Sequence, residues 1–468
     1  MMHRWPAWLA CVAALVVTDA GYADDGPADE SPPAETRPAD NQQLAWEVEG
    51  FLTGELRLRT ADGDADLDLI SQLAAVVTGK RLRARINARL NADLAGDQQS
   101  NELLFDTWDT FSGDVQVRTY EAYVAATKLF DGVGELIVGR QFVDEGTYFH
   151  FDGARLNLEL DEVLKHLQAS LFGGWSVRFR DDPEEDNWLI GLVLRGAAGT
   201  TKTRWRLEYF HVSEFFAGIN QTVIDPVQQP VVLPAQHFDD DLVALSIWHK
   251  AEQIRVFGRF SLLNGEPNEL QLRGRWFTKD GKWTVLVEWY QLFERLFDVT
   301  NDLTPFAPSL GSYEPYGRLT GRVTYRTEDW IAQAGLVYRA LLDDGVEGQF
   351  NHEYVNFYLT ATRLDLEDGK LDLSFTVNGY GTSGNRTTAV GGSADYRVLT
   401  TLTLSTGVDY SLWKYDWFLD TEHEDVWSVW VRAKWKARKK VTVEGGVSVD
   451  DDRFATYATV FVKVIWRF

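Results

Sequence analysis

The chain has 468 residues, with 18 Trp, 17 Tyr and 26 Phe, and a formal net charge of −24. The excess of acid argues against nucleic acid as a partner. Past the first 20 residues no run of about 18 apolar residues occurs, which excludes membrane-spanning helices. A transmembrane β-barrel passes this test, because alternating side chains hide an apolar face from any average over a window.

The first 23 residues are predicted to be a secretory signal peptide. Arg4 provides a basic start, residues 7–17 form an apolar run, and Ala23 offers the small residue that a signal peptidase selects. Cys11 is the only cysteine. The apolar run continues past it, so a lipoprotein site is not expected there. The mature chain would then have no cysteine and no thiol chemistry.

Residues 24–43 are rich in proline and acid and almost lack large apolar side chains. Such a segment cannot bury enough apolar surface to fold, so we expect a disordered acidic tail in the periplasm. It is far too short to be a plug that fills a barrel. Residues 44–468 are predicted to form one β-barrel domain, because a single alternating pattern continues to the end of the sequence.

The alternation begins at Trp46, and the clearest predicted strand covers 81–94. One of its faces carries Leu82, Ala84, Ile86, Ala88, Leu90, Ala92 and Leu94. The other face carries Arg81, Arg83, Arg85, Asn87, Arg89, Asn91 and Asp93. A helix would scatter these two sets around its circumference, so the pattern predicts a strand with one apolar and one polar face.

The predicted connections alternate between short and long. Asp131-Gly132 and Asp280-Gly281 are typical of tight hairpin turns. The longer connections are expected at 95–114, 142–152, 213–238, 296–313, 342–352 and 414–425. This asymmetry is typical of outer-membrane barrels, whose short turns face the periplasm, and both termini on that side require an even number of strands. We expect about 22 strands of ~9–11 residues. The weakest are 134–141, 153–160 and 389–396, without which the number falls toward 20 or 18.

The last strand ends on an aromatic residue. Its apolar face carries Val460, Val462, Val464, Trp466 and Phe468, while Lys463 lies on the opposite face. Such an ending resembles the closing strand of bacterial outer-membrane barrels, which the barrel assembly machinery recognises. We therefore expect an all-β, antiparallel transmembrane barrel without a plug, surrounded by lipid in the outer membrane of a Gram-negative bacterium.

The polar face of these strands is predicted to line the lumen, and it is unusually basic. Its cations are Arg81, Arg83, Arg85, Arg89, Arg118, Arg178, Arg195, Arg206, Arg255, Arg259, Arg273, Arg275, Arg318, Arg322, Arg326, Arg339, Arg432 and Lys434. Guanidinium groups in a confined lumen attract anions and offer forks suited to carboxylate and phosphate, which predicts an anion pathway. The alternative is that they pair with acids such as Glu121 and Glu208 and only brace the wall.

Catalysis is not expected. A hydrolytic site would need a Ser–His or Asp–His constellation, and the sequence offers no glycine-rich nucleophile turn near its histidines. Four of them, His150, His211, His237 and His352, lie in or near predicted loops. Zinc-ligand spacing is absent from the sequence, and 239–241 would at most bind Ca²⁺ weakly. We expect no enzyme activity, no metal and no cofactor.

One segment resembles a known family. Gly134-Glu135-Leu136-Ile137-Val138-Gly139-Arg140-Gln141 is followed by Phe151-Asp152-Gly153-Ala154-Arg155-Leu156. A strand that ends in Gly-Arg-Gln, then a loop, then Phe-Asp-Gly-x-Arg-Leu, resembles the alginate-export family of outer-membrane barrels. The resemblance implies a basic lumen through which an anionic polysaccharide leaves the cell. It also adds Arg140 and Arg155 to the predicted anion pathway.

Three functions fit these observations. The first is an outer-membrane pore that passes or exports an anionic solute, such as a polysaccharide similar to alginate, with periplasmic export proteins as partners. The second is a general diffusion porin. The third is a structural sheath whose lumen holds a partner protein, such as a multihaem cytochrome conduit. The sequence has no Cys-x-x-Cys-His, so any haem would belong to that partner. Neighbouring genes for polysaccharide synthesis or for cytochromes would distinguish these functions.

Overall fold

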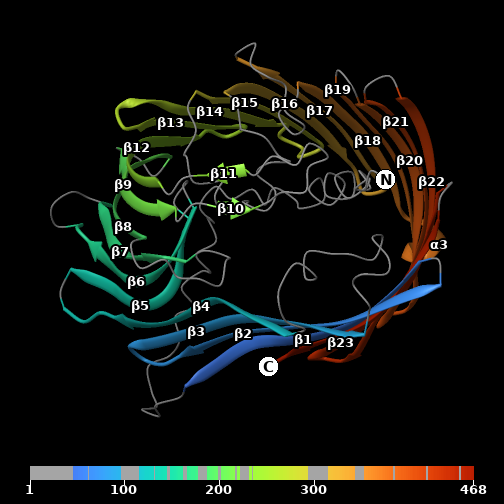
Figure 1. The fold of residues 1–468 in the computed structure, drawn as a ribbon, viewed down its shortest axis with the longest axis horizontal. Helices are drawn as coiled ribbons and strands as arrows, with labels where there is room; N and C mark the ends of the chain where they lie inside the picture. Colours follow the sequence, from blue (N-terminus) through green and yellow to red (C-terminus); the bar gives the residue numbers. More distant parts are fainter. Residues whose placement is uncertain are drawn as a thin grey trace.

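The computed structural model shows a single closed barrel (Figure 1). The structure describes residues 46–61, 63–95, 115–130, 132–144, 148–161, 166–177, 187–198, 202–216, 219–221, 231–233, 236–293, 315–342, 353–382, 385–417, 420–452 and 455–468. The predicted signal peptide at 1–23 and the predicted tail at 24–43 lie outside the described residues, so both stay predictions.

Twenty-two antiparallel strands make up the barrel wall. Each pairs with the next wall strand along the chain, and the ring closes where β1 (Glu47–Ala61) pairs with β24 (Thr456–Arg467). Leu56 of β1 lies opposite Val462 of β24, so the two strands share one apolar face. The predicted closed barrel is confirmed, and so is the best estimate of 22 strands.

The wall strands follow in chain order. The first are β1, β2 (Asp64–Thr78), β3 (Leu82–Ala95), β4 (Val115–Thr127), β5 (Val133–Asp144), β6 (Tyr148–Glu159), β7 (Gln168–Ser176), β8 (Trp188–Ala198) and β9 (Thr203–Phe216). Next come β12 (Gln236–Lys250), β13 (Ile254–Leu263), β14 (Glu266–Phe277), β15 (Trp283–Leu292), β16 (Tyr316–Arg326), β17 (Trp330–Leu341) and β18 (Tyr354–Asp365). The last are β19 (Leu371–Thr382), β20 (Asn385–Leu399), β21 (Leu402–Trp417), β22 (Asp420–Arg438), β23 (Val441–Asp451) and β24. The three weakest predicted strands are therefore real, as β5, β6 and β20.

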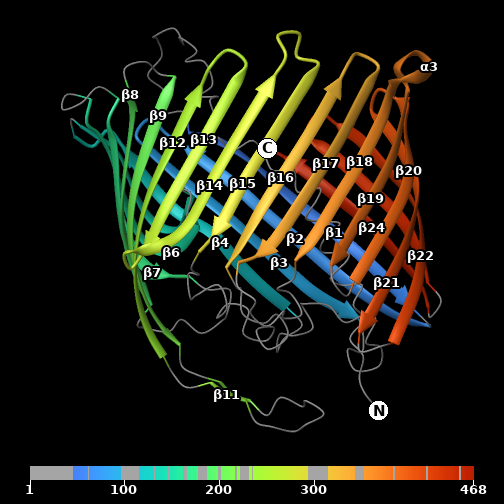
Figure 2. The same cartoon turned by 90° about the horizontal axis from the view of Figure 1, so that it is seen from above.

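Three short elements lie outside the wall. β10 (Ile219–Gln221) and β11 (Val231–Leu233) pair as a hairpin. β11 lies beyond the ends of the wall strands in Figure 2, and both strands fall within the barrel outline in Figure 1. α3 (Leu366–Gly369) is a single turn between β18 and β19. No element within the described ranges forms a plug.

Most of the wall strands are longer than expected. They range from 9 residues in β7 to 19 in β22. The predicted long connections at 142–152 and 414–425 are wrong in extent, because only 145–147 separate β5 from β6 and only 418–419 separate β21 from β22. Ladder hydrogen bonds come from the backbone, so a strand can continue past its apolar part into polar sequence.

The two ends of the barrel differ. At one end, the short-turn end, connections such as 251–253 and 327–329 join the strands, and β1 begins and β24 ends there. At the other, the long-connection end, 96–114 join β3 to β4 and 217–235 separate β9 from β12. The short-turn end is the side that the sequence predicts to be periplasmic.

The outer surface is apolar between two sets of tryptophans. Near the short-turn end, the exposed ones are Trp46, Trp276, Trp283, Trp330, Trp435 and Trp466. Near the long-connection end they are Trp175, Trp188, Trp289 and Trp427. Between them, side chains such as Val287 and Val429 are half exposed. An apolar band flanked by aromatic girdles is the surface of a barrel that spans a membrane.

Candidate functional site

The register of the strands decides which side chains face the lumen. Successive residues of a strand point to opposite faces, and Phe210 is completely buried, which only the inside of the ring can provide. Pairing extends this assignment, because Phe210 lies opposite Gly191 of β8 and Leu242 of β12. Followed around the ring, the lumen face carries the predicted cations Arg83, Arg85, Arg89, Arg118, Arg155, Arg195, Arg206, Arg255, Arg259, Arg273, Arg275, Arg318, Arg322, Arg326, Arg339, Arg432 and Lys434.

Two predicted cations lie elsewhere, and a third, Arg178, lies outside the described residues. Arg81 belongs to the turn between β2 and β3. The assignment of Arg140 to the lumen is wrong. It shares its face with Val138, which is 55% exposed on the outer surface, and it forms a two-pronged pair with Asp152 at 2.8 and 2.7 Å. Both faces of β5 are apolar around Ile137 and Val138, so the sequence carried no alternation to place its arginine.

The two motifs that carry the family resemblance form one structural unit. Gly139 lies opposite Gly153, and Gln141 lies opposite Phe151, on the neighbouring strands β5 and β6. A Cβ at Gly139 would lie 2.3 Å from the carbonyl oxygen of Ala122, so glycine is needed for close approach of the backbones. Of the two motif arginines, only Arg155 reaches the lumen face.

On the lumen face, arginines face arginines across neighbouring strands. Four pairs lie directly opposite one another: Arg89 and Arg118, Arg195 and Arg206, Arg255 and Arg275, and Arg318 and Arg339. Side chains in such positions have Cβ atoms about 5 Å apart, and like charges there destabilise a sheet. These pairs place positive charges side by side at four places on the lumen face, and two of their members, Arg206 and Arg318, also contact Glu208 and Glu288.

Other lumen cations pair with acids and brace the wall. Arg83 contacts Glu135 at 2.7 Å, and Arg85 contacts Glu121 at 2.8 Å. The pairs on the other strands include Arg57 with Asp68, Arg318 with Glu288, Lys434 with Glu444, and Lys463 with Glu55. The bracing alternative therefore holds for part of the basic face, and sequence alone did not single out Glu135 as a partner.

A buried charge network joins β9, β12, β13 and β14. Glu208 is completely buried, and Arg259 is 4% exposed and pairs with it. Arg259 also donates through Nε to Glu269 at 2.5 Å and through Nη1 to Ser246 at 3.3 Å. Arg206 lies beside Glu208 at 2.5 Å. Buried charges persist only when they are paired in this way, so these groups serve the wall rather than a solute.

Two arginines of β16 differ from these braced cations. Arg322 and Arg326 form no ion pair with any acid in the described part of the chain, and Arg326 is exposed. On β14, Arg273 lies over the ring of Phe257 at 5.2 Å and is half buried. These cations leave the lumen face with positive charge that the braces do not neutralise. In Figure 1, β14 to β16 lie on the edge of the barrel opposite β3 and β4.

The lumen face of β18 to β21 carries mainly uncharged polar side chains, and its charged members are Asp372, Asp395, Arg397 and Asp409. Its uncharged side chains are Tyr354, Asn356, Tyr358, Thr360, Thr362, Ser374, Thr376, Asn378, Tyr380, Thr387, Ser393, Ser405 and Ser411. Thr362 and Ser374 share a hydrogen bond at 3.0 Å, and Gln333 of β17 donates to the Tyr358 hydroxyl at 2.7 Å. The lumen thus combines a basic surface with a neutral hydroxyl wall.

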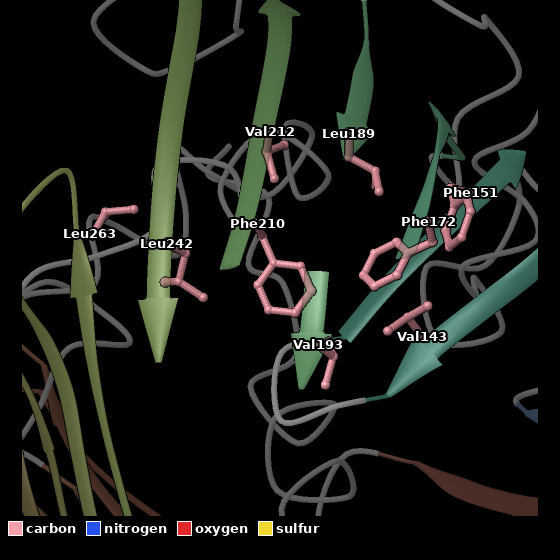
Figure 3. Close-up of a cluster of buried hydrophobic side chains, with 9 residues drawn as sticks. All are labelled: Val143, Phe151, Phe172, Leu189, Val193, Phe210, Val212, Leu242 and Leu263. Carbon is pink, nitrogen blue, oxygen red and sulfur yellow. The ribbon is translucent and has the colours of Figure 1, made fainter. Parts of the chain in front are cut away.

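An apolar corner fills the lumen face of β5 to β9, β12 and β13. Its buried members are Val143, Phe151, Phe172, Leu189, Val193, Phe210, Val212, Leu242 and Leu263 (Figure 3). The rings of Phe151 and Phe172 lie 5.6 Å apart, and those of Phe172 and Phe210 lie 5.7 Å apart. The sequence did not predict this corner, because an inward-facing phenylalanine looks like any other apolar residue of a strand.

Three of the four histidines that were predicted to lie in or near loops belong to strands. His150 of β6 contacts the backbone oxygen of Tyr120 at 2.7 Å, and His211 of β9 contacts Asp241 at 3.1 Å on the outer face. His237 lies in β12, and His352 lies outside the described residues. Within the described ranges, no three His, Cys, Asp or Glu side chains gather as metal ligands would.

The fold and its surface define a class, the membrane-spanning β-barrel. Among the residues that the structure describes, no helix is long and apolar enough to cross a membrane. No protein-family model matches the sequence, and no curated protein is detectably similar to it. The resemblance to the alginate-export family therefore stays a prediction.

Solved structures offer distant likenesses. A BenF-like porin from Pseudomonas fluorescens Pf-5 is 8% identical, with 90% of this chain and 98% of that chain covered and a TM-score of 0.46. The translocation pore of the P pilus usher PapC is 8% identical, with 90% and 99% covered and a TM-score of 0.48. Pseudomonas aeruginosa OpdK with vanillate is 10% identical, with 90% and 98% covered and a TM-score of 0.44. These values transfer no solute, partner or mechanism to this chain.

Proposed function

We propose that this chain is an outer-membrane pore of a Gram-negative bacterium whose basic lumen passes an anionic solute. The proposal depends mainly on the arginine pairs that lie side by side on neighbouring strands of the lumen face. Examples are Arg89 with Arg118 and Arg255 with Arg275. Together with Arg322 and Arg326, they create a positive field in a confined space, where fields act over longer distances than in open water.

The finer part of the proposal is the solute. The resemblance to the alginate-export family favours an anionic polysaccharide similar to alginate, and the neutral hydroxyl wall of β18 to β21 suits a partner that is rich in hydroxyl groups. Periplasmic export proteins would then deliver the polymer to the short-turn end. The barrel assembly machinery would insert the chain through its last strand, where Val462 and Trp466 face outward.

Ion selectivity in a planar bilayer tests the proposal. We expect anion selectivity at 0.1 M KCl that shrinks at 1 M, because the Debye length falls from about 10 Å to about 3 Å. Replacing Arg273, Arg322 and Arg326 together with Gln should reduce or reverse the selectivity. Within the described residues these side chains form no ion pair that the change would break, so folding should be preserved.

The matched control removes three positive charges from the turns. Lys370, Lys439 and Lys440 are exposed at the short-turn end, and their replacement with Gln should change the selectivity little at either salt concentration. A cation-selective wild-type pore would contradict the proposal. A closed pore that conducts only after a partner protein is stripped from it would favour the sheath instead.

A further inference from the structure

A cavity of about 790 Å³ lies at the short-turn end, beside the turns 251–253 and 278–282. Arg255 of β13 and Arg275 of β14 line it, together with Phe277. Its volume falls within the range of pockets that bind small organic molecules, and it is far larger than an inorganic ion requires.

The lining of this cavity is positively charged. Arg255 and Arg275 lie directly opposite each other in the register, so their side chains start about 5 Å apart. Lys279 adds a third cation, and Glu252 is the single acid among the described residues of the lining. Two arginine forks that leave neighbouring strands toward one cavity suit a carboxylate, which accepts two parallel N–H bonds.

The turn that carries Lys279 is held in one conformation. Gly281 has a φ of +70°, which favours glycine, and its N–H donates to the Thr278 oxygen at 3.0 Å. The Thr278 hydroxyl donates to the Asp280 carboxylate, which also accepts from the Lys282 N–H at 3.1 Å. These two bonds lower the pKa of Asp280, so its carboxylate stays ionised somewhat below the usual pKa of an aspartate and the turn keeps its charge-assisted bonds there.

Beside the cations, the cavity offers an aromatic face and a hydroxyl. The Arg255 guanidinium lies over the Phe277 ring, 5.4 Å from its centroid, and Thr284 lies opposite Phe277 in the register and lines the same cavity. An aromatic face packs against the C–H face of a sugar ring, while a hydroxyl group bonds its hydroxyls.

We propose that this cavity binds a carboxylated sugar, with Arg255 and Arg275 on the carboxylate and Phe277 against the ring. The site deepens the proposed function and rests on it for the route by which the solute arrives. It adds a saturable binding site at the short-turn end of the barrel. A basic lumen without such a site would only raise the local concentration of anions.

Calorimetric titration of the full chain in detergent, at 0.15 M salt, tests the site with galacturonate and with galactose as its neutral counterpart. Galacturonate should bind saturably, and galactose should give no saturable heat at the same concentrations. Arg255→Gln combined with Arg275→Gln should weaken galacturonate binding roughly tenfold or more, since an Arg–carboxylate fork is a strong charge-assisted contact. Glu252→Gln should strengthen binding by about threefold, because it removes the negative charge from the lining.

The control pair is Arg322→Gln with Arg326→Gln, which removes the same charge from the lumen face of β16. Two strand spacings, about 10 Å, separate β16 from β14, and the Debye length is about 8 Å at this salt concentration. We therefore expect a change of less than about twofold in this control. All variants should remain heat-modifiable on gels, which reports a closed barrel.

Three results would overturn the site: no saturable binding of galacturonate to the wild type, undiminished binding in the Arg255/Arg275 variant, or an equal loss in both double variants. Calorimetry does not require conduction. If the pore is anion-selective but shows any of these results, the proposed binding site is contradicted and the proposed function is not. If the pore is cation-selective but galacturonate binding depends on Arg255 and Arg275, the binding site is supported and the proposed function is contradicted.

Discussion

The apolar corner and the neutral wall of β18 to β21 lie at opposite ends of the barrel outline (Figure 1), and they use the inside of the ring differently. In the corner, inward side chains such as Phe151 and Phe210 are completely buried. In the wall, inward side chains such as Tyr358 and Asn378 are polar, and Thr376 is half buried. An inward position in a barrel therefore does not make a residue part of a channel.

Glycines let the corner close. A Cβ on Gly153 would lie 2.1 Å from the carbonyl oxygen of Gly173, and one on Gly174 would lie 2.2 Å from that of Asp152. Such close approach of β6 and β7 is typical of a tight bend at a barrel corner. Side chains from neighbouring strands then meet inside the bend and exclude water, which leaves the polar part of the lumen for a solute.

Truncation of a corner phenylalanine should have the largest effect on stability. Phe210→Ala removes a buried ring that contacts Phe172 and Phe149, and large-to-small changes of this kind cost about 3–5 kcal/mol. Tyr380→Ala in the neutral wall removes a ring of similar size that packs on Tyr354 at 5.4 Å, and we expect a loss of about 1 kcal/mol or less. Urea unfolding of the refolded barrel in micelles measures both, and equal losses would show that the corner is not a core.

Breaking a buried ion pair should likewise cost more stability than breaking an ion pair in the open lumen. Arg259→Gln leaves the buried carboxylate of Glu208 without its main partner, at a cost of about 3–5 kcal/mol. Arg83→Gln breaks a pair whose arginine is 39% exposed in the lumen, and it should cost about 1 kcal/mol or less. The same unfolding experiment compares the two variants. If Arg83→Gln lowers the free energy of unfolding as much as Arg259→Gln does, the open lumen would exclude water as completely as the apolar corner.

The outer face extends the comparison to lipid. Val462→Arg should destabilise the barrel by about 2–4 kcal/mol if the side chain lies near the bilayer midplane, because that face has no water. Lys463→Ala, one residue further, removes only a lumen pair with Glu55 at 3.3 Å, and it should cost a few tenths of a kcal/mol. Folding titrations into lipid vesicles measure both changes. Equal effects would contradict the assignment of the two faces.

Alternation along the sequence was sufficient to determine the barrel, its even strand number and the faces of its regular strands. Val462 and Lys463 lie on the faces that their order predicts, and so do Leu272 and Arg273. This works because a strand between lipid and water must place apolar and polar side chains on opposite sides, and the backbone period of two makes that pattern visible.

Where both faces of a strand are apolar, only the tertiary structure decided which side chains face the lumen. Two of the three weakest predicted strands, 134–141 and 153–160, became β5 and β6 of the corner, where Val143 and Phe151 are buried inside the ring. There the alternation disappears, and Arg140 was assigned to the wrong face. Register also decided which arginines meet acids, as Arg83 meets Glu135, and which meet arginines, as Arg255 meets Arg275. These partners lie on different strands, and only the pairing of strands in space brings them together.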